Sequence, residues 1–95
     1  MDIRFEWDES KNRANVRKHG ISFELARTAF YDPDGRFLPD PDHSETEERF
    51  LMLGLASDHR LLLVAHCFRE ADSIIRIISA RKATKHETSQ YVEHL

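Results

Sequence analysis

The stretch RFLMLGLASDHRLLLVAHCFREADSIIRIISAR, residues 49–81, decides the fold of this chain. It contains three apolar runs, residues 49–57, 60–68 and 73–81, each rich in the aliphatic and aromatic residues that favour strands. The polar breaks between these runs are two and four residues long, which is short enough for hairpin connections. The stretch therefore predicts three consecutive antiparallel strands.

The residues before this stretch predict one more strand and two helices. Residues 3–7 alternate apolar and polar side chains, a pattern typical of a short half-buried strand. Asp8 can cap a helix over residues 9–18, and Gly20 can take the left-handed position that closes it. Ser22 can cap a second helix, which the turn-forming residues Asp-Pro-Asp-Gly end.

Two further elements complete the predicted fold. Residues 36–38 fit a short edge strand bounded by prolines, and Thr84 with Glu87 matches a capping box that opens a C-terminal helix to about Glu93. The order of elements predicts the α+β class, as one domain over residues 1–95. We expect an antiparallel β-sheet of three to five strands, flanked by two N-terminal helices and one C-terminal helix.

Composition fits a small soluble protein. Apolar residues make up 40% of the chain and charged residues 33%, which argues against disorder. The longest apolar run, residues 61–65, is too short to cross a bilayer, and the N-terminus lacks the apolar stretch of a signal peptide. The single cysteine, Cys67, excludes an internal disulfide and favours a cytoplasmic location.

Charge is unevenly distributed along the chain. Residues 32–48 hold seven of the 17 acidic residues and one of the 14 basic ones, so the rest of the chain carries a net charge of +3. Residues 74–86 contain four basic residues and no acidic residue. An acidic loop beside a basic patch is compatible with phosphate binding. An ordinary solvated surface explains the same charges equally well.

Strand alternation gives a hypothesis about which side chains share a face. If the first hairpin turns over two residues and the second over four, Arg49, His66, Ser79 and Arg81 project from one side of the sheet. Arg76 then points to the opposite side. A one-residue slip in either hairpin would reverse the assignment.

Several motifs resemble the BrnT toxin family. The longest is Ile75 to Thr84, read as IRIISARKAT. The others lie along nearly the whole chain: Phe5-Glu6-Trp7-Asp8, Lys11, Asn15, Lys18-His19-Gly20, Phe23, Ala26, Arg49-Phe50, Gly54, His66, Glu87 and Tyr91.

The resemblance implies a fold related to the RelE-type ribonuclease toxins and metal-independent RNA cleavage that blocks translation. It also implies neutralisation by a BrnA-type antitoxin with a ribbon-helix-helix DNA-binding domain. Two toxin–antitoxin pairs would join through the antitoxin dimer as a heterotetramer, and operator DNA would be bound only through the antitoxin. No membrane partner is implied.

RNA cleavage without a metal requires a base, an acid and fixed positive charge on the phosphate. The candidates for catalysis are His66, Arg49, Arg76 and Arg81. His66 interrupts an apolar run and can transfer a proton, although a hydrogen-bonded core histidine is the alternative. Arg81 precedes a helix N-terminus, where anions bind. Arg49 can instead be a solvated strand end, and Arg76 can form a structural ion pair.

Six further residues are candidates for substrate binding: Lys18, His19, Lys82, Lys85, Glu87 and Tyr91. Lys82 and Lys85 would steer RNA rather than take part in the chemistry, and the other four have structural alternatives. Lys18 and His19 can simply end the first helix, and Glu87 can serve only as the capping-box partner. Tyr91 can pack in the core or stack on a base.

A metal or a nucleotide cofactor is not expected. The six histidines form no His-Glu-x-x-His motif, one cysteine cannot build a zinc ribbon, and no glycine-rich phosphate loop occurs. The sequence leaves one competing function, a non-catalytic binding subunit or degenerate toxin that acts as co-repressor with a DNA-binding partner.

Overall fold

The computed structural model describes residues 3–40 and 48–95. Their elements follow the chain as β1 (Arg4–Glu6), α1 (Glu9–His19), α2 (Phe23–Thr28), the 3-10 helix η1 (Ala29–Tyr31), β2 (Arg36–Pro39), β3 (Phe50–Leu55), β4 (Leu61–Arg69), β5 (Ile74–Lys82) and α3 (Lys85–Glu93). The predicted α+β class is confirmed, with three α-helices and a five-stranded sheet in the described residues. Residues 41–47, which are part of the acidic segment 32–48, lie outside the described residues.

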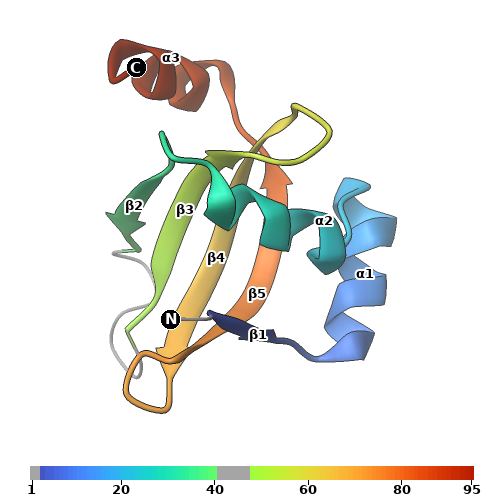
Figure 1. The fold of residues 1–95 in the computed structure, drawn as a ribbon. Coiled ribbons are helices and arrows are strands. Elements are labelled where there is room, and N and C mark those ends of the chain that lie inside the picture. The colour runs from blue at the N-terminus through green and yellow to red at the C-terminus, as the bar shows by residue number, and fades with distance from the viewer. Residues whose placement is uncertain (1–2, 41–47) are drawn as a thin grey trace.

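The sheet has the strand order β1-β5-β4-β3-β2 (Figure 1). Strands β2 to β5 pair antiparallel, as predicted. Strand β1 instead pairs parallel with β5, from Arg4 opposite Ile74 to Glu6 opposite Arg76. The expectation of a wholly antiparallel sheet is wrong at this edge. No hairpin joins β1 to β5, so the direction of pairing is not set by a turn.

The predicted caps at both ends of α1 and at the start of α2 are confirmed, whereas α2 ends at Thr28 and η1 lies between it and the predicted turn at residues 32–35. The Asp8 carboxylate accepts hydrogen bonds from the backbone N–H groups of Ser10 at 2.8 Å and Lys11 at 3.2 Å. Gly20 has φ 71° and donates its N–H to a carbonyl of the last turn of α1. The Ser22 hydroxyl accepts from the N–H of Leu25 at 3.1 Å, which begins α2.

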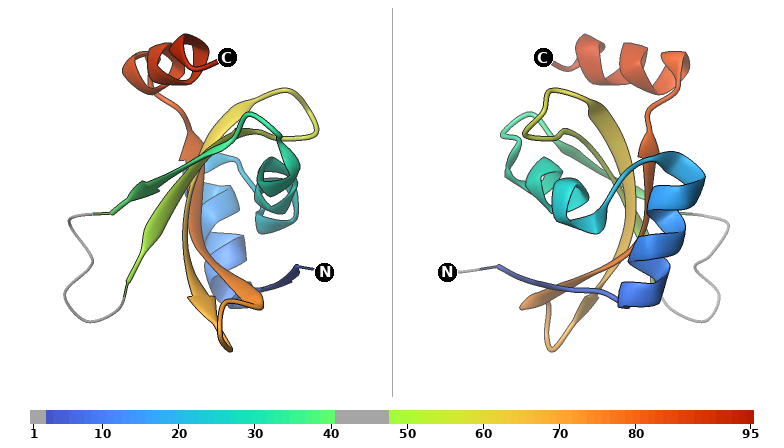
Figure 2. Two further views of the ribbon diagram at one scale, coloured as in Figure 1. Left: turned by 60° about the vertical axis from the view of Figure 1, so that its left-hand side comes forward. Right: turned by 90° about the vertical axis from the view of Figure 1, so that its right-hand side faces the viewer.

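The two faces of the sheet have different covers. Helix α2 and η1 pack on one face, called here the α2 face, and bury Phe23, Ala26 and Ala29 against strand residues such as Val64 and Ile77. Figure 2 shows α2 on this side and α1 beside the β5 edge. On the other face, the α3 face, a smaller cluster consists of Leu53, Leu63 and Tyr91 of α3.

Helix α1 is attached to the edge of β5 by an amide side chain. Asn15, only 7% exposed, donates from Nδ2 to the carbonyl of Ala80 at 2.8 Å and accepts from the Ala80 N–H at 3.2 Å. The same Nδ2 donates to the carbonyl of Ile21 at 2.8 Å. Asn15 thus pairs with β5 as a neighbouring strand would, beyond the point where β1 ends. It fixes the C-terminal end of α1 beside β5.

We expect Asn15→Ala to lower the free energy of unfolding by about 3 kcal/mol, because it removes the partners of three backbone groups. Urea denaturation measures the loss. Arg13→Ala, at an exposed position of the same helix, is the control and should change stability little. A loss below about 1 kcal/mol for Asn15→Ala would show that water replaces these bonds.

The first hairpin is one residue longer than predicted. Its loop comprises residues 57–59, with His59 in the left-handed region at φ 71°, and Leu55 pairs with Leu61. The N–H of Ala56 donates to the carbonyl of Arg60 at 2.8 Å and closes the loop. The predicted two-residue turn is therefore wrong, and the pairing of β3 with β4 shifts by one residue.

The second hairpin and the strand after it also differ from the prediction. The loop is four residues long but lies one residue later, with Arg69 opposite Ile74. A β-bulge then interrupts the β4–β5 pairing: Ala65 pairs with Ser79, whereas His66 pairs with Ile77. The extra residue in β5 turns every later side chain of that strand to the other face.

Candidate functional site

The polar residues of the strands divide between the two faces of the sheet. Directly paired residues share a face, and Leu63 pairs with Arg81, whereas Cys67 pairs with Arg76. Leu63 and Cys67 are four residues apart on β4, so Arg76 and Arg81 both project from the α3 face. The prediction that Arg76 points away from Arg81 is wrong, because the bulge lies between them.

A pocket of about 450 Å³ opens on the α3 face. Its polar lining consists of His19, Asp40, Arg49, Ser79 and Arg81. Aliphatic side chains of β3 and β4, among them Leu51 and Leu63, form its apolar part. We call it the arginine pocket. It brings together Arg49 and Arg81 from the predicted catalytic set and His19 from the predicted binding set, as well as Asp40, which the sequence did not single out.

Arg81 is held in place by Glu87 of α3. Its Nη1 and Nη2 donate to the two carboxylate oxygens of Glu87 at 2.8 and 3.0 Å, and Nη1 also donates to the Lys82 carbonyl at 3.1 Å. The hydrogen bonds between these two side chains raise the pKa of Arg81 and lower the pKa of Glu87. These bonds use three of the five N–H donors of the guanidinium, and 40% of the side chain stays exposed.

Glu87 also completes the predicted capping box, which is confirmed. Its Oε1 accepts from the N–H of Thr84 at 2.8 Å, and the Thr84 hydroxyl accepts from the Glu87 N–H at 3.1 Å. The N-terminus of α3 therefore holds an internal carboxylate at the place where an anion was expected. Glu87 joins the cap of α3 to Arg81.

Arg76 forms an ion pair with Glu6, its cross-strand partner on β1. The pair is partly exposed, with 29% of the Arg76 side chain open to solvent. Arg76 is not among the residues that line the arginine pocket. This position favours the structural ion pair that the sequence left as the alternative.

His66 lies on the α2 face, away from the arginine pocket. It pairs with Phe50 and Ile77, is fully buried, and its ring packs against those of Phe30 and Phe68 at centroid distances of 4.8 and 5.3 Å. The prediction that it shares a face with Arg49, Ser79 and Arg81 is wrong. The first hairpin turns Arg49 away from it, and the bulge turns Ser79 and Arg81 away.

The surroundings of His66 are those of a neutral core histidine. Its Nδ1 lies 3.1 Å from the carbonyl of Val64, which can only accept, so Nδ1 carries the hydrogen. Nε2 is buried without a partner among the residues that the structure describes. Burial lowers the pKa of His66, since the charged form is poorly solvated there.

This burial predicts a pH dependence of stability. As the pH falls below 6.5, the ordinary pKa of histidine, His66 becomes protonated in the unfolded chain but stays neutral in the folded protein. The free energy of unfolding should be greatest above that pH and decrease by up to about 1 kcal/mol per unit between about pH 6.5 and 5. The carboxylates whose pKa is lowered change the free energy of unfolding only at lower pH. Denaturation of His66→Leu, compared with the exposed His94→Leu, should show the dependence removed only in the first.

The remaining residues of the predicted binding set are three exposed lysines and one buried tyrosine. Lys18 is exposed beside His19 at the end of α1, Lys82 is exposed at the end of β5, and Lys85 is exposed at the start of α3. Tyr91 is buried at 4% exposure, and its hydroxyl donates to the carboxylate of Asp32. Burial raises the pKa of Tyr91. Its position favours the packing role over stacking on a base.

Within residues 3–40 and 48–95, no cluster of three or more histidine, cysteine, aspartate or glutamate side chains suits a metal ion. Of the helices that the structure describes, none has the length and apolar character to span a membrane.

Comparison with known proteins gives a family and a fold. The sequence model of the ribonuclease toxin BrnT of type II toxin–antitoxin systems matches residues 7–87. The crystal structure of the Brucella abortus ribonuclease toxin BrnT is similar to this chain with a TM-score of 0.62 and 21% identity. The match covers 88% of this chain and 100% of the other. A search of curated proteins gives no match.

Proposed function

Since the chain belongs to the BrnT family of ribonuclease toxins of type II toxin–antitoxin systems, we propose that it cleaves RNA at the arginine pocket without a metal ion and so inhibits translation. The observation that carries the proposal is the convergence of two arginines and a histidine from three separate elements on one pocket: Arg49 before β3, Arg81 on β5 and His19 at the end of α1.

The arginines supply fixed positive charge for the phosphate. A guanidinium stays charged at all relevant pH values, and its planar fork matches two phosphate oxygens. Arg81 is oriented by Glu87 while part of its side chain faces solvent, so it is preorganised before RNA arrives. The aliphatic wall of the pocket strengthens the interaction because it lowers the local dielectric constant.

Cleavage then requires two proton transfers. The 2′-hydroxyl loses its proton as its oxygen forms a bond to phosphorus, and the bond from phosphorus to the 5′-oxygen breaks as that oxygen gains a proton. The products are a 2′,3′-cyclic phosphate and a 5′-hydroxyl. We assign one of these transfers to His19, because it is the histidine that lines the arginine pocket, whereas His66 is enclosed on the other face. Asn15 positions His19 by fixing α1 to β5.

The exposed lysines extend the binding surface. Lys18 follows the same end of α1 as His19, while Lys82 and Lys85 lie near Arg81 in the sequence. Their positive charges attract the RNA phosphates, and they take no part in bond breaking.

The partner of a type II toxin is an antitoxin. We propose a BrnA-type protein with a ribbon-helix-helix domain, two copies of which join two toxin chains into a heterotetramer in the cytoplasm. Operator DNA is bound through the antitoxin alone. Expression of this chain without a partner should arrest growth, whereas a non-catalytic co-repressor subunit would leave growth unaffected.

Purified protein freed from any partner tests the cleavage directly. We expect RNA to be cut in the presence of EDTA and to carry a 2′,3′-cyclic phosphate or 3′-phosphate at the new end, as mass spectrometry of the fragments would show. A loss of cleavage in EDTA that added Mg²⁺ restores would reject the metal-free mechanism. Intact RNA under both conditions would reject the nuclease function.

A further inference from the structure

Asp40 is a buried residue of the arginine pocket whose carboxylate has no role in the cleavage described so far. It is 8% exposed and lines the pocket together with His19, Arg49 and Arg81. Cleavage requires two proton transfers, one from the 2′-hydroxyl and one to the 5′-oxygen. His19 supplies one of them, so the same pocket has to contain a second group that can take up or give a proton.

The strand pairing fixes the face of the sheet from which Asp40 projects. Pro39, the last residue of β2, pairs with Phe50. The N–H of Asp40 then donates to the carbonyl of Arg49 at 3.2 Å, which extends the pairing of β2 with β3 by one residue. Phe50 pairs with His66 and so projects from the α2 face. The next pair, Asp40 and Arg49, therefore projects from the α3 face, where the arginine pocket opens.

The other described polar residues of the pocket are poor bases. Arg49 and Arg81 keep their protons, and the hydroxyl of Ser79 is neutral. A carboxylate, by contrast, has two oxygens that accept hydrogen bonds. One oxygen of Asp40 can take a proton from a ribose while the other keeps a hydrogen bond to the protein. Asp40 is thus suited to the proton transfer that His19 leaves open.

Asp40 and His19 reach the pocket from opposite sides of the sheet. Asp40 follows β2, at one end of the strand order, whereas His19 ends α1, which Asn15 attaches to β5. Figure 1 shows β2 and α1 on either side of β3 and β4. In a displacement at phosphorus the attacking and leaving oxygens lie roughly in line, on opposite sides of the phosphorus atom. The base and the acid must therefore also approach from opposite sides.

We propose that Asp40 is the general base of the cleavage and His19 its general acid. The Asp40 carboxylate takes the proton of the 2′-hydroxyl as that oxygen forms its bond to phosphorus. The bond from phosphorus to the 5′-oxygen breaks, and protonated His19 gives its proton to that oxygen. This inference rests on the proposed ribonuclease function and adds which group acts at which oxygen.

A dinucleotide in which sulfur replaces the 5′-oxygen distinguishes the two roles, because a thiolate leaves without taking up a proton. It is compared in EDTA with the ordinary dinucleotide, and chromatography of the products gives both rates. We expect His19→Ala to recover on the sulfur substrate most of the rate that it loses on the ordinary one. Asp40→Asn should be about 10²- to 10⁴-fold slower than the wild-type protein on both, because each substrate still needs a base.

The pH profile on the sulfur substrate separates a base from a carboxylate that only supports the fold. In Asp40→Asn hydroxide has to take the proton, so the rate should rise about tenfold per pH unit between about pH 7 and 9. The wild-type rate should change little over this range. Asp40→Glu keeps a carboxylate and should keep the flat profile, even where its rate is lower. The slope does not depend on how much of a variant is folded.

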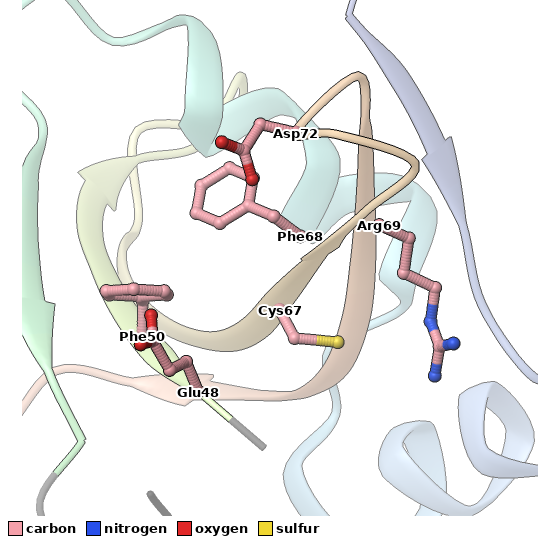
Figure 3. A pocket seen from close by; sticks show the side chains of 6 residues that line it. All are labelled: Glu48, Phe50, Cys67, Phe68, Arg69 and Asp72. Carbon is pink, nitrogen blue, oxygen red and sulfur yellow. The ribbon is translucent and has the colours of Figure 1, made fainter.

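Asp72→Asn is the control, since it makes the same chemical change in another pocket. That pocket, of about 420 Å³, lies at the β4–β5 hairpin, and its lining includes Asp72, Phe50 and Phe68 (Figure 3). Phe50 and Phe68 project from the α2 face with His66, away from the arginine pocket. The rates and the pH profile of Asp72→Asn should equal those of the wild-type protein.

A flat pH profile in Asp40→Asn would overturn Asp40 as the base. Recovery of Asp40→Asn, rather than of His19→Ala, on the sulfur substrate would also overturn the assignment, because it would exchange the two roles. In both cases cleavage by the wild-type protein leaves the ribonuclease function standing. A wild-type protein that cuts neither dinucleotide nor longer RNA would reject that function and this inference together.

Discussion

Arg81→Ala is expected to lower the rate of RNA cleavage about 10²- to 10³-fold, the loss found when one preorganised donor to a developing negative charge is removed. The orientation of Arg81 in the arginine pocket is well defined, because both carboxylate oxygens of Glu87 accept its hydrogen bonds. Single-turnover cleavage of a defined RNA measures the loss. Arg81→Lys should recover only part of the rate, since lysine keeps the charge but not the fork.

The effect on stability should be small, which separates catalysis from folding. The Arg81–Glu87 pair is partly exposed, and such pairs contribute about 1 kcal/mol or less. Glu87 keeps its bond to the Thr84 N–H when Arg81 is removed, so the cap of α3 persists. Urea denaturation should therefore show nearly unchanged unfolding.

The chain provides a matched control. Arg60 pairs with Asp58 at 2.7 Å in the first hairpin, with a side-chain exposure close to that of Arg81. Arg60→Ala removes a comparable ion pair away from the pocket, and its cleavage rate should equal that of the wild-type protein. Equal losses in the two variants would mean that Arg81 acts only through general charge, and full activity of Arg81→Ala would remove it from the site.

The helices and the positions of the strands along the chain follow from local signals. Asp8, Ser22 and Thr84 each accept a backbone N–H at the start of the helix that the sequence predicted after them. Such caps act within three residues and need no knowledge of the rest of the chain. The three apolar runs predicted β3, β4 and β5 for the same reason.

The sequence pattern could not decide from which face of the sheet each side chain projects, because this depends on the length of a loop and on a β-bulge. Both faces of the sheet are apolar, so hydrophobic alternation could not decide between neighbouring registers. An additional loop residue, with His59 in a left-handed conformation, moved Arg49 relative to His66. The bulge beside Ala65 then moved Ser79 and Arg81 in the same sense. The two shifts cancel, so the arginines still share a face and only His66 is lost from it.

The role of Asn15 could not be read from the sequence. An asparagine inside a helix usually indicates a solvated position, and its bonds to Ala80 join residues 65 apart in the chain. Helix α1 has few apolar side chains and depends on such amides, since Asn12 also accepts from the Phe23 N–H at 2.8 Å. Contacts of this kind decide where His19 lies, and they are visible only in the fold.

His19→Ala is expected to reduce cleavage about 10²- to 10⁴-fold, the contribution of a positioned general acid or base. His19 ends α1, is half-buried, and lines the pocket that also contains Arg49 and Arg81. If it transfers a proton, imidazole added to the His19→Ala protein should restore part of the rate, because the cavity left by the side chain opens on the arginine pocket. A histidine that only terminates the helix would not be replaced by a free imidazole.

Variants of two other histidines serve as controls for this experiment. His94→Ala, at an exposed position after α3, controls for the loss of a surface imidazole and should cleave normally. His66→Leu removes the buried imidazole on the α2 face and should also cleave normally above pH 7, where burial already keeps that ring neutral. A severe loss in His66→Leu with normal unfolding, together with full activity in His19→Ala, would return the proton transfer to His66. It would also require the α2 face to open during catalysis, because the buried ring cannot otherwise reach a phosphate.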